Sequence, residues 1–170
     1  MIVRPLAPVD GPAWHRLLID GTKTFPSAFL QSAKEARSIP ADRIQAIMAS
    51  GDFHGVFAPD NVLIGFAALR QPSLTRLRHR ATIGPFYIAP THHGRGAADR
   101  LMAGLCDAAR AAGIAWLDLW VAASNGRAIA FYTRHDFEQV ARRPDAVRRD
   151  GLSEDDLLMT RHLEAPAAGG

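Results

Sequence analysis

The sequence predicts an α+β fold, in which helices come first and strands dominate the rest of the chain. Apolar residues recur at helical spacing within residues 12–51, and from Phe53 the pattern changes to the period of strands. A strand, a helix, a strand and a helix then follow before the closing strands, an order typical of α+β proteins. The chain has 170 residues, enough for a single domain with its own core.

Composition places the chain among ordinary soluble proteins. Apolar types make up 48% of the residues and charged types 22%, which excludes wholesale disorder and fibrous repeats. Cys106 is the only cysteine, so an internal disulfide framework and cysteine-based zinc sites are excluded. The formal net charge of +3 is a mild bias that suits a phosphate-bearing ligand. No segment reaches the roughly 18 apolar residues of a membrane span, and we therefore expect a cytoplasmic protein.

A short edge strand and three helical stretches are predicted before Phe53. The strand lies at residues 2–3, and a helix begins near Pro12 and ends at Gly21. Ser27 is predicted to cap the second helical stretch, and residues 40–51 form the third.

Strands dominate from Phe53 to residue 88. Residues 56–58 and 62–69 are predicted to form a hairpin with a tight turn between them. Residues 75–88 continue the sheet, and Arg76, Arg78 and Arg80 occupy alternate positions on one face, which we expect to face solvent.

The remaining elements are two helices and three strands. They are expected at 97–112 (helix), 114–121 (a strand buried on both faces), 125–134 (helix), and 137–141 and 156–162 (strands joined through a turn at 149–151). Residues 164–170 are expected to be a flexible tail, which leaves one domain at 1–163.

One loop has the features of an anion site. A strand at 83–88 leads into His93-Gly94-Arg95-Gly96-Ala97-Ala98, which opens a helix. Glycine lets the backbone approach a ligand closely, and the free N–H groups of a helix start favour a pyrophosphate. The loop lacks the Gly-Lys-Ser/Thr ending of a Walker loop, and Asp99 stands where a dinucleotide fingerprint needs glycine. From this loop alone, an ordinary turn before a helix is an equal alternative.

The same run resembles the central motif of the GNAT acyltransferase family, Arg/Gln-x-x-Gly-x-Gly/Ala. Gly96 and Ala98 match it, whereas His93 stands where Arg or Gln is usual. A second block resembles the family's motif Asn-x-x-Ala-x-x-Phe-Tyr-x-x-x-Gly-Phe, and its matching residues are Asn125, Ala128, Phe131, Tyr132 and Phe137. Asp136 replaces the usual glycine of this motif, at a position that we expect to need a left-handed backbone.

The resemblance implies a mixed, mainly antiparallel central sheet flanked by helices on both faces, with acetyl-CoA as the cosubstrate. We predict no metal site, because the adjacent His92 and His93 are expected to point apart and no carboxylate stands at ligand spacing. The positions that the resemblance assigns to acetyl-CoA are Phe86, Tyr87, Ile88, His93, Gly94, Arg95, Gly96, Ala97, Ala98 and Asn125. Asn125 is equally well suited to cap the last helix.

The resemblance also implies a catalytic role for Tyr132, as the acid that protonates the departing thiolate. Phe29 and Glu35 lie in a stretch similar to one that walls the acceptor pocket in some small members of the family, and they are the candidates for contacting the amine. The general base stays unassigned, because Thr82 and Gly84 are uncharged where some relatives carry glutamate.

The predicted activity is therefore acetyl transfer from acetyl-CoA to a primary amine of a small molecule, an amino acid or a peptide, by direct attack in a ternary complex. The alternative is a binding module without catalysis, which would be either a coenzyme A sensor or a nucleic-acid binder. A nucleic-acid binder would use Arg76, Arg78, Arg80, Arg142, Arg143, Arg148 and Arg149. We expect no membrane partner, whereas the acceptor, the acyl-chain preference and the oligomeric state, a homodimer included, stay open.

Overall fold

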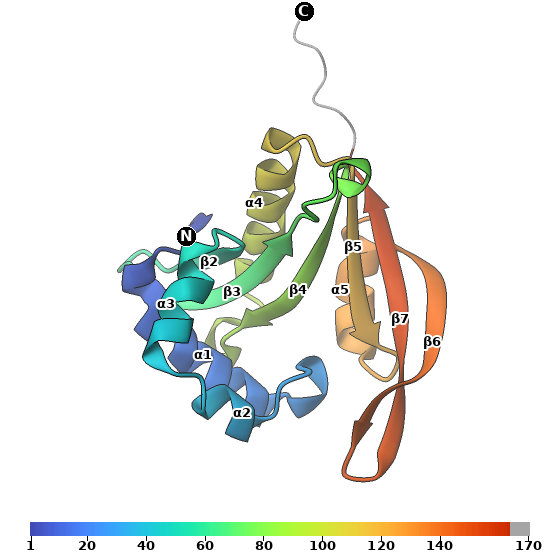
Figure 1. Cartoon of the computed structure of the whole chain (residues 1–170), viewed down its shortest axis with the longest axis horizontal. Helices are drawn as coiled ribbons and strands as arrows, with labels where there is room; N and C mark the ends of the chain where they lie inside the picture. Colours follow the sequence, from blue (N-terminus) through green and yellow to red (C-terminus); the bar gives the residue numbers. More distant parts are fainter. Residues whose placement is uncertain (164–170) are drawn as a thin grey trace, which may run out of the picture. The chain divides into compact units, whose positions relative to one another are not determined.

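The computed structural model describes residues 1–163 of the chain (Figure 1). The expected tail at 164–170 lies outside the described residues. The strands are β1 (Ile2–Pro5), β2 (Phe53–Phe57), β3 (Leu63–Arg70), β4 (Arg80–Ile88), β5 (Trp116–Ala122), β6 (Glu138–Arg149) and β7 (Leu152–His162). The α-helices are α1 (Gly11–Thr24), α2 (Ala33–Arg37), α3 (Ala41–Ala49), α4 (Ala97–Ala111) and α5 (Gly126–Arg134).

The strands of residues 1–163 are ordered β1-β2-β3-β4-β5-β7-β6 in one sheet. The pairs β1–β2, β2–β3, β5–β7 and β6–β7 are antiparallel, whereas β4 and β5 are parallel. The predicted fold class, a mixed and mainly antiparallel sheet flanked by helices, is confirmed. No helix within the described residues combines the length and the apolar composition that a membrane crossing requires.

The described chain forms two compact units. Unit 1 consists of Met1–Arg70 and Gly84–Ala108, and unit 2 of Gln71–Ile83 and residues 109–163. The boundary falls within β4, so that Arg80 to Ile83 belongs to unit 2 and Gly84 to Ile88 to unit 1.

Unit 1 buries an aromatic core between α1, α3 and one face of its strands. Trp14 meets Phe53 edge-on at 5.2 Å between ring centroids, and Phe66 lies within 6.2 Å of both rings. Tyr87 of β4 extends this cluster, with its ring 5.8 Å from that of Phe66. Trp14 and Leu18 are one turn apart on α1, which is why the predicted apolar stripe packs here.

Unit 2 has its buried side chains on one face of β5 and β7. Leu117, Leu119 and Val121 alternate along β5 and are buried, as are Leu157 and Met159, which pair with Val121 and Leu119. Because successive side chains of a strand point to opposite faces, Trp116, Asp118 and Trp120 share the second face.

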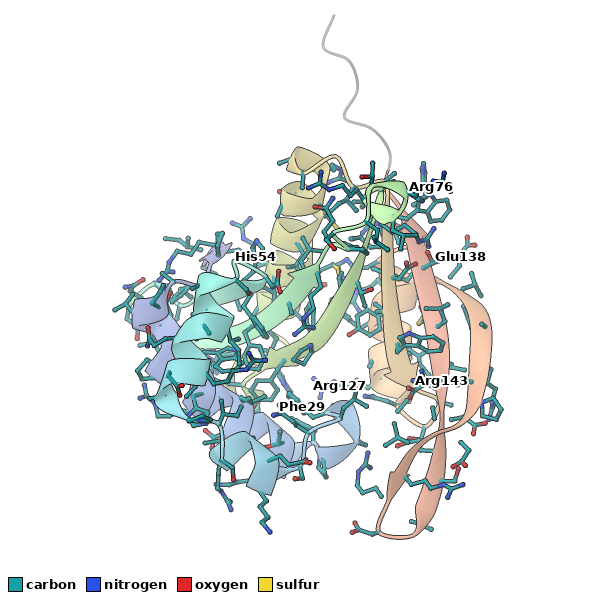
Figure 2. The ribbon with its side chains drawn as sticks, viewed as in Figure 1. Phe29, His54, Arg76, Arg127, Glu138 and Arg143 are labelled. Carbon is teal, nitrogen blue, oxygen red and sulfur yellow. The ribbon has the colours of Figure 1, made fainter. Side chains whose placement is uncertain are left out.

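That second face corrects one prediction. The strand at 114–121 was expected to be buried on both faces, but Trp120 is 41% exposed. Arg143, labelled in Figure 2, lies on β6. Its guanidinium lies 4.4 Å from the centre of the Trp120 ring and covers part of it. A cation over an indole face is a favourable way to hold a large ring at the surface.

The arginine prediction at 75–88 is also wrong in part. Thr75–Leu77 forms a single 3-10 turn, and β4 begins only at Arg80, so the three arginines do not share an extended face. Arg80 forms an ion pair with Asp118 instead of facing solvent alone. Likewise Ser32 caps α2 in place of Ser27, because its hydroxyl accepts the N–H of Glu35 at 3.2 Å.

Candidate active site

The predicted anion loop connects β4 to α4 within unit 1. His93 ends a 3-10 turn, Gly94 and Gly96 adopt left-handed φ angles of 70° and 77°, and α4 begins at Ala97. No atom lies within 4 Å of where a Cβ would stand on either glycine, so backbone conformation and not crowding selects glycine here. The N–H groups in the first turn of a helix have no intrahelical acceptors, and they can bind the oxygens of a phosphate.

The His93 side chain ties this loop to the end of β4. Its Nε2 lies 2.8 Å from the carbonyl oxygen of Ile88, so that Nε2 must carry a proton and donate. The ring also stacks on Phe25 with a centroid distance of 5.9 Å. Phe25 closes α1, and the imidazole therefore holds together three segments: the end of α1, the end of β4 and the loop.

In the second half of β4, residues 84–88, the backbone and not the side chains supplies the polar groups that a ligand could bind. The ring of Tyr87 is buried against Phe29 and Phe66, and burial raises the pKa of its hydroxyl. The β4–β5 ladder has three pairs and ends at Thr82 with Asp118, so the backbone of residues 84–88 adds no pair to that ladder. An extended ligand could therefore use those backbone groups of this stretch that point away from β3, the neighbour of β4 on its other side. Pro85 offers no N–H, and the carbonyl oxygens of Gly84 and Ile88 already accept from Arg70 and His93.

Phe29 and Glu35 have different surroundings. Phe29, labelled in Figure 2, is buried. Its ring lies 5.8 Å from that of Tyr87. Glu35 is exposed and completes a capping box, in which its carboxylate accepts the Ser32 N–H at 2.7 Å. Hydrogen bonds from Ser32 lower the pKa of Glu35 and keep it ionised. The structure thus places Phe29 beside β4 and gives Glu35 a role in starting α2.

Asn125 and Tyr132 belong to α5 in unit 2. The side-chain oxygen of Asn125 accepts the N–H of Ala128 at 3.1 Å, so it caps this helix, one of the two roles expected for it. Asp136 has φ of 60°, as expected where the family motif has glycine. Phe137 follows it and is buried.

Tyr132 is a buried phenol in an aromatic setting. It is 9% exposed, and its ring lies 5.4 Å from that of Phe131 and 5.8 Å from that of Phe137, edge-on to both. Burial raises the pKa of the Tyr132 hydroxyl, which keeps it protonated through the neutral range. It can therefore donate a proton but cannot serve as a resting base.

An ion-pair network in unit 2 was not predicted. Arg80 binds Asp118 through two donors, and Thr160 donates to the same carboxylate at 2.8 Å. These residues lie on β4, β5 and β7 and are far apart in sequence, so no local spacing could indicate the network. The stacking of Phe25 on His93 was also missed, because the two residues lie far apart in the sequence.

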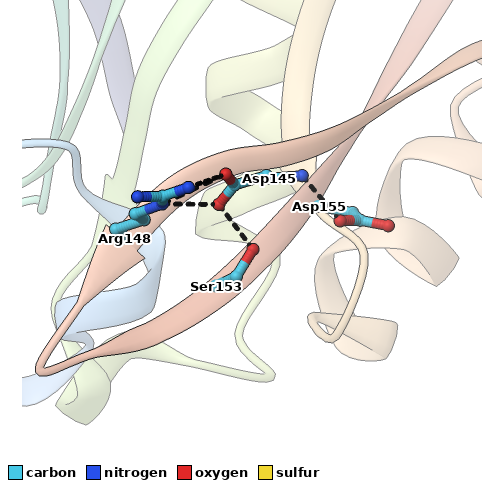
Figure 3. A network of polar contacts seen from close by, with 4 residues as sticks. All are labelled: Asp145, Arg148, Ser153 and Asp155. Carbon is cyan, nitrogen blue, oxygen red and sulfur yellow. Dashed lines mark hydrogen bonds and ion pairs between the residues drawn. The ribbon is translucent and has the colours of Figure 1, made fainter.

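The arginines of the β6–β7 hairpin are neutralised by carboxylates. The pairs are Arg142 with Asp155, Arg143 with Asp156, Arg148 with Asp145, and Arg149 with Glu154. Figure 3 shows the part around Asp145, which also accepts the Ser153 hydroxyl at 2.6 Å while its own N–H donates to Asp155 at 2.9 Å. A nucleic-acid surface needs unpaired basic residues along one face, and these four arginines do not supply it.

No group of three or more His, Cys, Asp or Glu side chains in residues 1–163 is arranged to hold a metal ion. Cys106 is buried on α4.

The family model of the acetyltransferase (GNAT) family matches residues 14–137. This range contains the loop after β4, the whole of α5 and the buried Tyr132. A search of curated proteins gives no significant match.

Solved structures with the same fold include several acetyltransferases. An N-acetyltransferase from Staphylococcus aureus Mu50 has 16% identity and a TM-score of 0.82, with 96% of this chain and 98% of that chain covered. The yncA protein of Salmonella typhimurium, solved with its cofactor acetyl-CoA, has 20% identity and a TM-score of 0.82, with 100% and 98% covered. A GNAT superfamily phosphinothricin acetyltransferase from Sinorhizobium meliloti, in complex with acetyl-CoA, has 17% identity and a TM-score of 0.80, with 99% and 91% covered. At these identities the likeness is one of fold.

Proposed function

The chain belongs to the acetyltransferase (GNAT) family, and from that premise we propose that it transfers an acetyl group from acetyl-CoA to the primary amine of a small molecule, an amino acid or a peptide. The observation that carries the proposal is the loop between β4 and α4, in which two left-handed glycines precede the start of a 15-residue helix. Two neighbours of the same fold, cited above, are bound to acetyl-CoA. We expect the reaction to take place in the cytoplasm.

The backbone of unit 1 would hold the coenzyme. In this proposal the N–H groups of residues 94–98 bind the pyrophosphate, helped by the positive end of the α4 dipole. The main chain of Phe86, Tyr87 and Ile88 pairs with the pantetheine arm, because that stretch is not used by the β4–β5 ladder. An N–H near Ile88 polarises the thioester carbonyl, and Asn125 adds a contact to the arm while it caps α5.

The reaction needs two proton movements. The amine attacks the thioester carbon, the C–S bond breaks, and the departing thiolate takes a proton from the Tyr132 hydroxyl. The amine nitrogen loses its own proton, and no base is assigned to that step. Burial raises the pKa of the Tyr132 hydroxyl, which keeps this donor protonated before the thiolate forms and also makes it a weaker acid than a phenol in water.

The first experiment is a calorimetric titration with acetyl-CoA, followed by a free-thiol assay of the same sample against pooled amines, amino acids and peptides. Binding with thiol release supports the proposal and identifies the acceptor class. Binding without release from any pool favours a coenzyme A sensor, and the absence of binding contradicts the family interpretation of the loop. The variant Gly96→Val should fold and bind acetyl-CoA more weakly, since φ of 77° disfavours a β-branched residue.

The role of Tyr132 is tested by Tyr132→Phe, which preserves the ring contacts with Phe131 and Phe137. General acid catalysis contributes roughly a hundredfold to ten-thousandfold, so kcat should fall by about a hundredfold or more. The affinity for acetyl-CoA should stay the same, which separates the loss of a proton donor from the loss of the fold. An unchanged kcat would remove Tyr132 from the mechanism.

A further inference from the structure

A cavity of about 330 Å³ lies within unit 1, away from the loop that precedes α4. Its walls come from α1, the segment before α3, α3 itself, the start of β2, the end of β3 and Pro85 of β4. Neither the residues assigned to acetyl-CoA nor Phe29 and Glu35 line it. A volume of this order is typical of pockets that bind small molecules.

The base of the cavity is apolar and rigid. Trp14, Leu18 and Phe53 line it, and each of them is at least nine-tenths buried in the core of unit 1. The edge-on contact of the Trp14 and Phe53 rings fixes both side chains. The indole N–H of Trp14 has no acceptor among the residues that the structure describes, and a buried donor of this kind is costly unless something accepts it.

The rim of the cavity is polar and carries charges of both signs. Its polar residues are Gln31, Arg43, Ser50, Asp52 and Arg70. Across residues 1–163, neither arginine forms an ion pair with Asp52 or with any other carboxylate. Charged groups that share a cavity without pairing can bind a ligand that carries the opposite charges.

Two of these charges are held in place by the fold. One N–H of the Arg70 guanidinium donates to the carbonyl oxygen of Gly84, and the group lies 5.3 Å from the centre of the Phe53 ring. Four further N–H groups of Arg70 remain for a ligand. The backbone of Asp52 is anchored on both sides, since its N–H donates to the Ser50 hydroxyl at 3.2 Å and its carbonyl accepts the Leu69 N–H at 2.8 Å. Arg43 is exposed on α3 and supplies a second cation.

We propose that this cavity binds a small amphoteric carboxylic acid with an apolar body, of the size and chemistry of an apolar α-amino acid. The carboxylate binds Arg70 and Arg43, the ammonium group binds Asp52, and the apolar body lies against Trp14 and Phe53. The rim thus offers a counter-charge to each end of a zwitterion, with Arg43 and Arg70 for the carboxylate and Asp52 for the ammonium group. Asp52 disfavours a phosphate dianion, and the apolar base disfavours a fully hydrated ligand.

Binding at this cavity requires neither acetyl-CoA nor turnover, because every residue that it uses belongs to unit 1 and lies outside the proposed coenzyme loop. It can therefore be measured with the full chain alone. Loss of acetyl-CoA binding would contradict the proposed function and leave the cavity untouched, whereas loss of amino-acid binding would do the reverse.

The probes are L-phenylalanine and L-leucine, with L-phenylalaninamide as the analogue that lacks a carboxylate and 3-phenylpropanoate as the one that lacks an ammonium group. Binding is measured by calorimetry and by the shift of the three indole N–H signals in ¹⁵N-labelled protein, assigned with Trp116→Phe and Trp120→Phe. The Trp14 signal should move on addition of L-phenylalanine, while those of Trp116 and Trp120 stay in place. No heat and no shift with either amino acid at millimolar concentration would overturn the proposal.

Charge variants identify the contacts. Arg43→Gln and Arg70→Gln should each weaken L-phenylalanine binding about tenfold or more, because a charge-assisted hydrogen bond is lost. Asp52→Asn should abolish the preference for L-phenylalanine over 3-phenylpropanoate. Arg16→Gln is the matched control, since Arg16 is exposed on α1 and does not line the cavity. Equal affinities in the wild type, Arg43→Gln and Arg70→Gln, all with unchanged melting temperatures, would overturn the proposal.

Discussion

Replacing Asp118 by asparagine should destabilise the protein by about 2–3 kcal/mol. Asp118 Oδ2 accepts from Arg80 Nε at 2.8 Å, and Asp118 Oδ1 accepts from Thr160 at 2.8 Å and from a second Arg80 nitrogen. Removing one partner of a buried ion pair costs about 3–5 kcal/mol, whereas an exposed pair contributes about 0–1 kcal/mol. The side chains of Arg80 and Asp118 are 34% and 19% exposed, which places this pair between the two cases.

The chemistry of the substitution supports the upper part of that interval. An asparagine amide has one acceptor oxygen, and its NH₂ group would face the guanidinium, where two donors oppose each other. The pair also lies next to the last rung of the β4–β5 ladder, since Asp118 pairs with Thr82 in register. Both strands therefore lose an attachment at the point where their pairing ends.

Urea unfolding of the wild type and of Asp118→Asn at neutral pH measures the difference, and the melting temperature should fall by about 4–12 °C. Asp42→Asn is the control, because Asp42 is an exposed carboxylate on α3 that forms no ion pair within residues 1–163. A loss for Asp118→Asn below about 0.5 kcal/mol would refute the reasoning, because that value is typical of a fully solvated pair.

The stability difference should also depend on pH in a defined direction. Burial opposes ionisation of Asp118, but hydrogen bonds from Arg80 and Thr160, together with the charge of Arg80, outweigh burial and hold its pKa below the usual value. A lowered folded pKa gives stability that is present above the unfolded pKa and is lost as pH falls through the folded one. The wild type and Asp118→Asn should therefore converge in strongly acidic solution.

Three further substitutions test the proposed coenzyme site. In Gly65→Ala, the new Cβ would lie 2.4 Å from Ile88 Cδ1 and 2.7 Å from the Tyr87 carbonyl oxygen, so that β4 must shift. We expect the free energy of unfolding in urea to fall by about 1–3 kcal/mol and acetyl-CoA binding in calorimetry to weaken. His93→Ala removes the hydrogen bond to Ile88, which contributes about 1 kcal/mol to stability, and should weaken acetyl-CoA binding. An affinity equal to that of the wild type would show that the loop keeps its conformation without the imidazole. Asn125→Ala removes the cap of α5 and should lower the free energy of unfolding by about 1 kcal/mol, whereas Asn125→Asp keeps the cap. If Asn125→Asp also keeps full acetyl-CoA affinity in calorimetry, the Asn125 side chain acts only as a helix cap.

Local patterns predicted the elements that local physics controls. The helix at 97–112 and the hairpin at 56–69 were expected from their spacing, and the structure has α4 at Ala97–Ala111 and strands on both sides of that turn. The left-handed backbone at Asp136 was also expected, because the glycine usual at this motif position indicates a positive φ, which Asp tolerates better than most residues.

Long-range packing decided the features that were missed. Alternate arginines at 76, 78 and 80 are compatible with a strand. The position of the Arg80 side chain is set by its ion pair with Asp118, which lies 38 residues further along the chain. Trp120 has the apolar character of a core residue, yet Arg143 from β6 covers it at the surface. The cavity in unit 1 draws its walls from several separate segments, so no motif could indicate it.

The early end of the β4–β5 ladder also bears on how the protein behaves at high concentration. A strand edge whose N–H and C=O groups are unused by its neighbour is a template for a strand of another molecule. Pro85 stands in this part of β4 and has no N–H to donate, so it interrupts a regular ladder with an incoming strand. Pro85 thus limits the regular pairing that this stretch of β4 can offer to a strand of another molecule.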